Sequence, residues 1–269
     1  MAISVHAPTL ASETVFHLGS FEIRNTLIMA WLAMFFFLGL GLLLRRTHYK
    51  EIPGRFQAFF EMIIEGLFDF FDSIVQDRTA TRRFFPLVAT ILIFLTIANW
   101  MGILPGVNSI TIEGMHDGQL MNIPIFRSMN ADVNMTLAIA IISVVSTQVF
   151  GIAALGVMPF ASKYFVAPWR DPIGSFVGIL ELVAEFAKMI SFTFRLFGNI
   201  FAGEVLLVVI FALMPYVAPL PFLGLEIFVG FVQGLVFSLL TIVFLKMAIT
   251  AHGGHGEQHR GHGHQVTHA

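Results

Sequence analysis

An apolar segment with no internal proline runs from Pro172 to Met214 and reads PIGSFVGILELVAEFAKMISFTFRLFGNIFAGEVLLVVIFALM. It follows Asp171, and an aspartate before a proline is a strong helix start, because the carboxylate caps the first turn and proline fits the first helical position. A helix of this length would measure about 64 Å, whereas a bilayer core is only about 30 Å thick. Its last turns, 205–214, are purely apolar, which argues against protrusion into water. The segment therefore predicts a long, steeply tilted membrane helix.

The composition of the whole chain also indicates a membrane protein. Of its 269 residues, 57% are hydrophobic and only 12% are charged, whereas a soluble domain carries about 25% charged residues. This excludes a soluble enzyme. The formal net charge of -2 argues against a nucleic-acid partner, and the absence of cysteine excludes disulfides and thiolate chemistry.

Four more membrane helices are predicted around the long one. Three uncharged segments are long enough to cross a bilayer, namely 26–44, 84–104 and 133–160. Three closely spaced prolines end the long helix and begin a second one over 222–249; they are Pro215, Pro219 and Pro221. The last two helices, 172–214 and 222–249, should form a tilted antiparallel hairpin.

Residues 55–76 form a different kind of helix. An apolar stripe follows one face, and an acidic face follows the other, made of Glu61, Glu65, Asp69 and Asp72. Such a helix can lie in the membrane interface, and an ordinary amphipathic helix packed on protein is the alternative. The predicted fold is a single domain over 1–269, an all-α polytopic membrane protein with five membrane helices plus one interfacial amphipathic helix.

The distribution of basic residues predicts the orientation. Lys and Arg gather between the first two spans and before Pro172, whereas the other side has only Arg24 and Arg127. The N-terminus should therefore lie outside and the C-terminus in the cytoplasm, with no cleaved signal, as a multi-pass protein of the cell inner membrane. The tail 252–269 has six histidines among Gly and polar residues. We expect it to be disordered, with metal binding as the alternative.

Charges inside the two long helices are the candidate functional residues. They are Glu181, Glu185, Lys188, Arg195 and Glu204 on the first helix and Glu226 on the second, together with the polar Gln233. A charge at the bilayer centre costs about 2.5–3.5 kcal/mol, so these residues indicate an ion path. Structural salt bridges are the alternative, and Glu185 with Lys188 fits either reading. Arg195 has no acid within one turn and must find its partner elsewhere.

Helical geometry gives a provisional register for the hairpin. Residues equally far from the turn face each other, which pairs Arg195 with Gln233 and Glu204 with Glu226. The same register pairs Gly198 with Gly230, and two small residues would let the backbones approach.

The sequence around Arg195 resembles the a subunit of F-type ATP synthases. The hallmark is Arg195-Leu196-Phe197-Gly198-Asn199 followed by Ala202-Gly203-Glu204, and further matches are Asn99-Trp100-Met101, Leu104-Pro105, residues 131–136 and Gln233. The resemblance implies a non-catalytic stator subunit without cofactor or metal. Such a subunit offers two proton half-channels to a rotating ring of c subunits and couples proton flow to ATP synthesis. Its implied partners are the c-ring, b-type peripheral stalk subunits, membrane lipid and, indirectly, the catalytic head.

The resemblance also implies roles for single residues. Arg195 would face the ring carboxylate with Gln233 beside it, and Glu204 and Glu226 would lie in the outer half-channel. This chain departs from many bacterial members, which have histidine at the position of Glu226. Because two facing carboxylates cannot both ionise cheaply, one of the pair is expected to hold a proton. The alternative is that only one of the two acids contacts water and the other is a hydrogen-bonded packing residue. The other expected proton-translocation residues are Asn199, Ser191, Lys188 and Glu185. The alternative function is a stand-alone secondary ion transporter, which would typically show inverted repeats and broken helices; neither is evident in the sequence.

Overall fold

The computed structural model describes residues 12–18, 21–46, 54–104, 106–107, 110–116, 119–164, 172–214 and 216–250. In chain order the elements are β1 Thr14–Leu18, β2 Phe21–Arg24, α1 Asn25–Arg46, α2 Arg55–Val75, α3 Arg78–Ile103, β3 Thr111–His116, β4 Gln119–Pro124, the 3-10 turn η1 Met129–Ala131, α4 Val133–Leu155, α5 Val157–Tyr164, α6 Pro172–Leu213 and α7 Pro219–Ile249. Five of these helices are long and apolar enough to cross a membrane: α1, α3, α4, α6 and α7. The predicted all-α membrane fold with five spans is confirmed. Asp171 and the His-rich tail lie outside the described residues.

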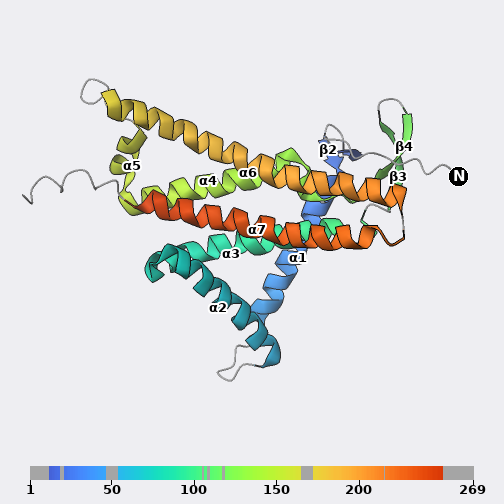
Figure 1. Ribbon diagram of the computed structural model, residues 1–269, viewed down its shortest axis with the longest axis horizontal. Coiled ribbons are helices and arrows are strands. Elements are labelled where there is room, and N and C mark those ends of the chain that lie inside the picture. The colour runs from blue at the N-terminus through green and yellow to red at the C-terminus, as the bar shows by residue number, and fades with distance from the viewer. Residues whose placement is uncertain are drawn as a thin grey trace, which may run out of the picture.

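Two short β-hairpins, which the sequence did not predict, mark one end of the helix bundle. Strand β1 pairs antiparallel with β2, and β3 pairs antiparallel with β4. Figure 1 places β2, β3 and β4 beside the turn between α6 and α7, whereas α5 lies at the opposite end. We call these two ends the hairpin end and the α5 end. The start of α1 and the end of α7 therefore lie at opposite ends, as an odd number of spans requires.

Helix α7 contacts α2, α3, α4 and α6, and it packs most closely on α3. These two helices share more contacts than any other pair, whereas α6 and α7 contact each other much less and α4 touches both of them. In Figure 1 α6 and α7 converge at the hairpin end and splay apart toward α5. The predicted antiparallel hairpin is present, but its second helix packs mainly on α3.

The glycines of α7 explain why this helix packs on α3. A Cβ on Gly230 would lie 3.0 Å from Asn99 Cβ on α3, and nothing described lies within 4 Å of a Cβ on Gly198. The predicted contact between Gly198 and Gly230 is therefore wrong. Small residues let two helices approach closely, and here they bring α7 against α3 instead of α6.

We expect Gly234→Val to destabilise the bundle. A Cβ at Gly234 would lie 2.7 Å from Thr96 Oγ1, 3.2 Å from the Leu92 carbonyl oxygen and 3.3 Å from Thr96 N. Backbone atoms cannot rotate away, so overpacking should cost about 1–3 kcal/mol. A lower midpoint of thermal unfolding in detergent would show this. Gly224→Val is the matched control, because no described atom lies within 4 Å of a Cβ there, and an equal loss in both variants would contradict the prediction.

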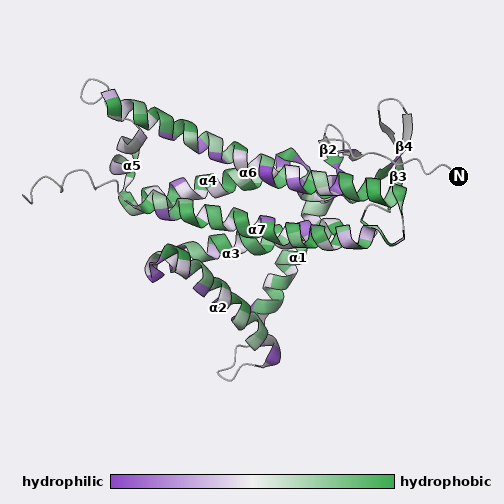
Figure 2. Cartoon of the chain, viewed as in Figure 1, coloured by the Kyte–Doolittle hydropathy of each residue, from purple (hydrophilic) through white to green (hydrophobic). Residues whose placement is uncertain are grey.

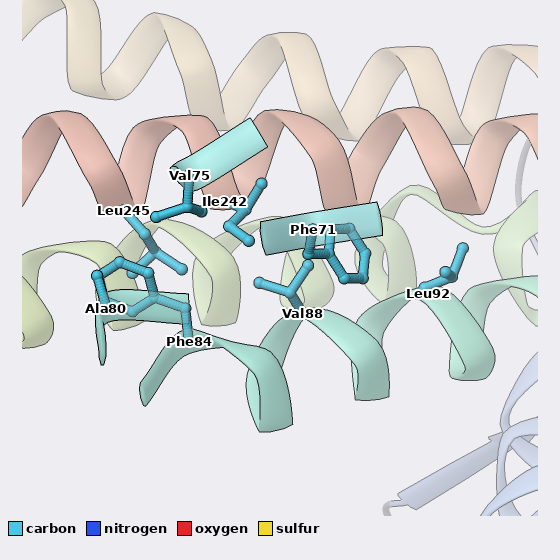
Figure 3. Close-up of a cluster of buried hydrophobic side chains, with 8 residues drawn as sticks. All are labelled: Phe71, Val75, Ala80, Phe84, Val88, Leu92, Ile242 and Leu245. Carbon is cyan, nitrogen blue, oxygen red and sulfur yellow. The ribbon is translucent and has the colours of Figure 1, made fainter. Parts of the chain in front are cut away.

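A buried apolar cluster joins α2, α3 and α7 near the α5 end. Figure 3 shows its members, which are Phe71, Val75, Ala80, Phe84, Val88, Leu92, Ile242 and Leu245. Phe71 of α2 is 0% exposed, whereas Phe59, Met62 and Ile63 nearer the start of that helix remain exposed. Helix α2 thus packs on protein at its C-terminal end and keeps an exposed apolar surface nearer its start, and its position in the membrane interface stays a prediction.

Three helix boundaries differ from the predicted ones for local reasons. Helix α3 begins at Arg78 rather than at 84, because the Asp77 side chain accepts hydrogen bonds from the backbone N–H groups of Thr79 and Ala80. Helix α4 ends at Leu155 rather than at 160, because Gly156 adopts a φ of +85° that L residues rarely take. Helix α7 begins at Pro219 rather than at 222, with its prolines in the first turn.

Hydrophobic residues predominate along the five long helices, as the colours of Figure 2 show, and many of their large apolar side chains are exposed. Helix α1 exposes Phe35, Leu38 and Leu43, and α6 exposes Phe176, Val183 and Phe186 along its length. Surfaces of this kind are stable only against lipid or another apolar protein. The structure is that of a multi-pass membrane protein.

Candidate functional site

Arg195 lies on an exposed face of α6. Leu196 and Ile200 turn into the core with Phe192, and this fixes the rotation of the helix. The exposed face then presents Arg195 among small residues, which are Ala184, Ala187, Ser191, Gly198 and Ala202. Arg195 makes no hydrogen bond or ion pair with any described residue of the chain. The guanidinium thus stands alone in a strip whose small side chains leave room for another helix.

Gln233 pairs with Asn199 rather than with Arg195. Asn199 Nδ2 donates to Gln233 Oε1 over 2.8 Å. Gln233 is only 4% exposed, and its Nε2 has no hydrogen-bond partner among the described residues. The partner of Gln233 is therefore one helical turn further along α6 than the predicted partner, Arg195. The Gln233 Nε2 group, which has no hydrogen-bond partner among the described residues, lies just beyond Arg195 toward the hairpin end.

The Asn99-Trp100 pair of α3 holds α7 by its backbone. Asn99 Nδ2 donates to the Gly230 carbonyl over 2.9 Å, and Trp100 Nε1 donates to the Ile227 carbonyl over 2.9 Å. Asn130 Nδ2 donates in turn to Asn99 Oδ1 over 2.6 Å. These contacts fix the height and rotation of the part of α7 that contains Glu226 and Gln233.

Glu204 forms an ion pair with Arg127, a residue from the segment between β4 and η1. Arg127 Nε donates to Glu204 Oε1 over 3.0 Å, and Arg127 Nη2 donates to Glu204 Oε2 over 3.2 Å. The side chains are 2% and 11% exposed, respectively. Such a bidentate pair is strong because both partners are charged and the geometry is planar.

Glu226 lies next to this ion pair. A Cβ on Gly203 would lie 2.7 Å from Glu226 Oε1, so the absence of a side chain at Gly203 makes room for the carboxylate. The charges of Glu226 and Glu204 interact, and Glu226 Oε2 is buried without a hydrogen-bond partner among the described residues. The two predicted facing carboxylates are thus neighbours, but Glu204 is bound to Arg127 as well.

A second polar group lies toward the α5 end. Lys188 Nζ donates to Glu185 Oε1 over 2.7 Å and lies 4.5 Å from the centre of the Phe244 ring. Tyr164 of α5 donates its hydroxyl proton to Gln148 Oε1 over 3.0 Å. Burial, together with the negative charges of Glu185 and Glu181, raises the pKa of Tyr164 to about 12. These acids therefore lie close to Tyr164.

Asp132 ties the N-terminal segment to the bundle at the hairpin end. Its carboxylate accepts hydrogen bonds from Ser12 Oγ over 2.7 Å, from Thr26 Oγ1 over 3.0 Å and from Asn134 N over 2.8 Å. Burial acts to raise the pKa of Asp132, but these bonds and the charge of Arg24 outweigh it and leave the pKa below its ordinary value. Asp132 therefore caps α4 as an anion and anchors the segment before β1.

The described residues contain no group of three or more histidine, aspartate or glutamate side chains placed to hold a metal ion. The polar side chains that α6 and α7 bring together include carboxylates, amides and Lys188, which can accept or donate protons or hydrogen bonds.

Comparison with known proteins shows the family of the chain. The sequence model of the ATP synthase A chain matches residues 27–246. The chain belongs to the ATP synthase A chain family. The ATP synthase subunit a of Syntrophobacter fumaroxidans is 34% identical over 234 residues, which cover 86% of this chain and 87% of that protein. The subunit a of Desulfotalea psychrophila is 36% identical over 200 residues (73% of each chain), and that of Moorella thermoacetica is 29% identical over 239 residues (88% and 96%).

Membership of the A chain family confirms the predicted resemblance and makes the chain a component of an ATP synthase rather than a stand-alone secondary transporter. Of the predicted site residues of this A chain, the structure brings together Asn199 with Gln233, Glu204 with Glu226, and Glu185 with Lys188. Ser191 and Arg195 share the exposed strip instead.

Arg127 belongs to the candidate site of the A chain, although its place in the sequence does not predict this. In the sequence it is one of two basic residues on the predicted outer side. One signal was available: Glu204 is a carboxylate in an apolar helix with no basic residue within one turn toward either end, so it needed a partner from a distant segment.

Proposed function

We propose that this A chain is the proton-channel stator of the ATP synthase membrane sector, with the c-ring lying against the strip around Arg195. The observation that carries the proposal is the position of Arg195, exposed and without a partner in the described chain, in a face of small side chains. An unpaired guanidinium in a membrane is costly. A carboxylate on a neighbouring helix of the ring would supply the missing partner.

A guanidinium suits this place because it stays protonated and cannot pass a proton itself. It attracts an ionised ring carboxylate and favours release of its proton. It also blocks a direct leak between the two half-channels. Each proton that crosses gains about 2.3 kcal/mol per 100 mV, and this free energy becomes rotation only if the direct route is closed.

The outer half-channel would run along Glu204 and Glu226 to Asn199 and Gln233. The two carboxylates lie nearer the hairpin end than Arg195 does, with Glu204 about 14 Å further along α6. The Asn199–Gln233 pair lies between them and Arg195 and has a spare donor at Gln233 Nε2. A proton passed from the carboxylates would reach the ring beside Arg195.

The inner half-channel would begin at the α5 end, where Glu185 and Lys188 lie near Tyr164. Glu185 can take up a proton that leaves the ring, and Lys188 keeps the carboxylate hydrogen-bonded. In this proposal the α5 end faces the cytoplasm and the hairpin end faces the outside of the inner membrane. It agrees with the basic residues before Pro172 and between the first two spans.

The stator also needs contacts outside the ring. We propose that b-type peripheral stalk subunits bind the A chain and connect it to the catalytic head, so that the ring turns while the A chain does not. Without this restraint the proton flow would turn both parts together and would produce no torque on the head.

Neutralising both outer carboxylates tests the proposal. In vesicles that contain the membrane sector without the catalytic head, Glu204→Gln with Glu226→Gln should slow passive proton conduction by about tenfold or more, since a positioned proton-transfer group commonly contributes 10²–10⁴-fold. The readout is the decay of an imposed pH difference. The matched control neutralises two exposed carboxylates of α2, Glu65→Gln with Asp69→Asn. Unchanged conduction in the first variant would remove the two glutamates from the path.

A further inference from the structure

Three phenylalanine rings gather at the interface between α6 and α7. The ring centre of Phe192 on α6 lies 4.5 Å from that of Phe237 and 5.9 Å from that of Phe244, both on α7. Phe192 and Phe237 are 2% and 1% exposed, and Phe244 packs against the same buried cluster. Rings whose centres are 4.5 Å apart are in contact, so no water molecule fits between Phe192 and Phe237. We call these three residues the aromatic group.

The aromatic group separates the two polar groups that α6 and α7 form. Toward the hairpin end, Asn199 donates to Gln233, which lies one turn before the aromatic group on α7. Toward the α5 end, Lys188 lies one turn before the aromatic group on α6, and its Nζ is 4.5 Å from the centre of the Phe244 ring. Lys188 and Asn199 are about 16 Å apart along α6. The rings fill the interface between these two levels.

Buried polar atoms that lack a hydrogen-bond partner lie on only one side of the aromatic group. On the described parts of α3, α6 and α7 they are Thr96 Oγ1, Glu226 Oε2 and Gln233 Nε2. Glu226 and Gln233 precede Phe237 in α7, on the side of the hairpin end. Thr96 Oγ1 lies 2.7 Å from the place that a Cβ on Gly234 would take. Because such atoms ordinarily bind water, a hydrated path from the hairpin end should end at the aromatic group.

The hydroxyl groups of α7 at the level of the aromatic group are already bonded within the protein. Ser238 Oγ donates to the Leu235 carbonyl, and Thr241 Oγ1 donates to the Phe237 carbonyl. Ser143 of α4 and Thr241 share a further hydrogen bond of 2.8 Å. A hydroxyl has only one proton to donate, so these side chains offer no free donor to a chain of water molecules. The interior is thus dry at this level.

We propose that the aromatic group is a proton barrier inside the A chain, which closes the interface between α6 and α7 so that protons must cross on the ring. The proposal rests on the proposed function. Arg195 lies on the exposed face of α6 and can close only the route beside the ring, whereas Phe192 and Phe237 are buried. A proton finds no hydrogen-bond acceptor among the rings, and a charge without one is costly to bury. The ammonium group of Lys188 at the Phe244 ring also repels it.

The test measures proton leak through the whole complex in vesicles that contain no nucleotide. The catalytic head then cannot turn over, so the ring does not rotate and any proton flow bypasses it. Phe237→Asn should make an imposed membrane potential decay at least about fivefold faster per complex, because a buried amide binds water in the interface. Phe237→Leu should stay tight, since leucine is smaller than phenylalanine but equally dry. A leak of the same size in both variants would overturn the proposal, because polarity would not matter.

A second buried phenylalanine separates the barrier from general damage to the core. Phe84 of α3 is 1% exposed, as Phe237 is, but it belongs to the cluster shared with α2 in Figure 3. Phe84→Asn should lower the amount of assembled complex, because it buries an amide among apolar side chains, and it should not raise the leak per complex. Equal leaks in Phe84→Asn and Phe237→Asn would overturn the barrier.

A less buried position covers the case in which Phe237→Asn does not assemble with the catalytic head. Phe244 is only partly buried, so Phe244→Asn should cost less stability and still admit water at the end of the barrier. A tight Phe244→Asn complex would then overturn the proposal, and a leaking one would support it.

The outcomes also separate the barrier from the proposed function. A tight Phe237→Asn complex, with Arg195→Ala inactive in ATP synthesis, would overturn the barrier and leave the proposed function intact. An active Arg195→Ala variant would overturn the proposed function itself.

Discussion

Replacing Arg195 by alanine is expected to abolish proton-driven ATP synthesis, with a loss of at least 100-fold, while the complex still assembles. The side chain is exposed and has no hydrogen bond or ion pair with the described residues. Its removal should therefore change the stability of the chain by less than about 0.5 kcal/mol, as is usual for surface substitutions. The whole effect should appear in the interaction with the ring carboxylate.

Arg195→Lys should be nearly as inactive. Lysine keeps a positive charge, but it loses the planar fork that binds a carboxylate with two hydrogen bonds, and it can lose its proton when desolvated. The measurements are the rate of ATP synthesis in vesicles and the amount of catalytic head that co-purifies with the A chain. Arg82→Ala, an exposed arginine near the start of α3, is the control. Normal synthesis in the alanine variant would contradict the assigned role.

The sequence predicted the long helices well because their limits are set locally. Pro172 begins α6 as predicted, and the proline group around Pro215 separates it from α7, since proline cannot continue a helix. The number of spans follows from the length of each apolar segment. Features of this kind depend on neighbours in the chain and can be derived without knowing the fold.

Partners between helices were harder to predict, because periodicity shows which face is apolar and not what covers it. Gly230 was assigned to α6, yet it faces Asn99 on α3. The two helices of the predicted hairpin do contact each other, but α7 packs mainly on α3, and α4 lies against both α6 and α7. The hairpins β1–β2 and β3–β4 were not predicted, because a hydropathy pattern identifies membrane spans and carries little information on strands as short as these.

Some residues of the candidate site can be predicted from the sequence, and others cannot. Arg195, Glu204 and Glu226 could be identified from the sequence, because charges in apolar helices are costly and stand out. Arg127 could not be assigned to Glu204, since 77 residues separate them. Because Arg127 lies in a connecting segment, the sequence favours its interpretation as an ordinary basic loop residue.

The ion pair between Arg127 and Glu204 should be essential for the stability of the A chain. Both side chains are largely buried, so Arg127→Met would leave the Glu204 carboxylate without its guanidinium. Breaking a buried pair on one side commonly costs about 3–5 kcal/mol, because an uncompensated charge remains. We expect a sharply reduced amount of A chain in the membrane and a lower midpoint of thermal unfolding of the complex.

A second variant separates stability from proton conduction. Arg127→Met combined with Glu204→Gln removes both charges, so most of the lost stability should return, since replacing both partners of a buried pair by neutral groups is often nearly neutral. Conduction should nevertheless stay slow, because glutamine cannot accept and release a proton. If the single variant were as stable as the wild type, the pair would not be buried in the complex. If the double variant conducted protons normally, Glu204 would act only as the counterion of Arg127, and the outer path would have to run through Glu226 alone.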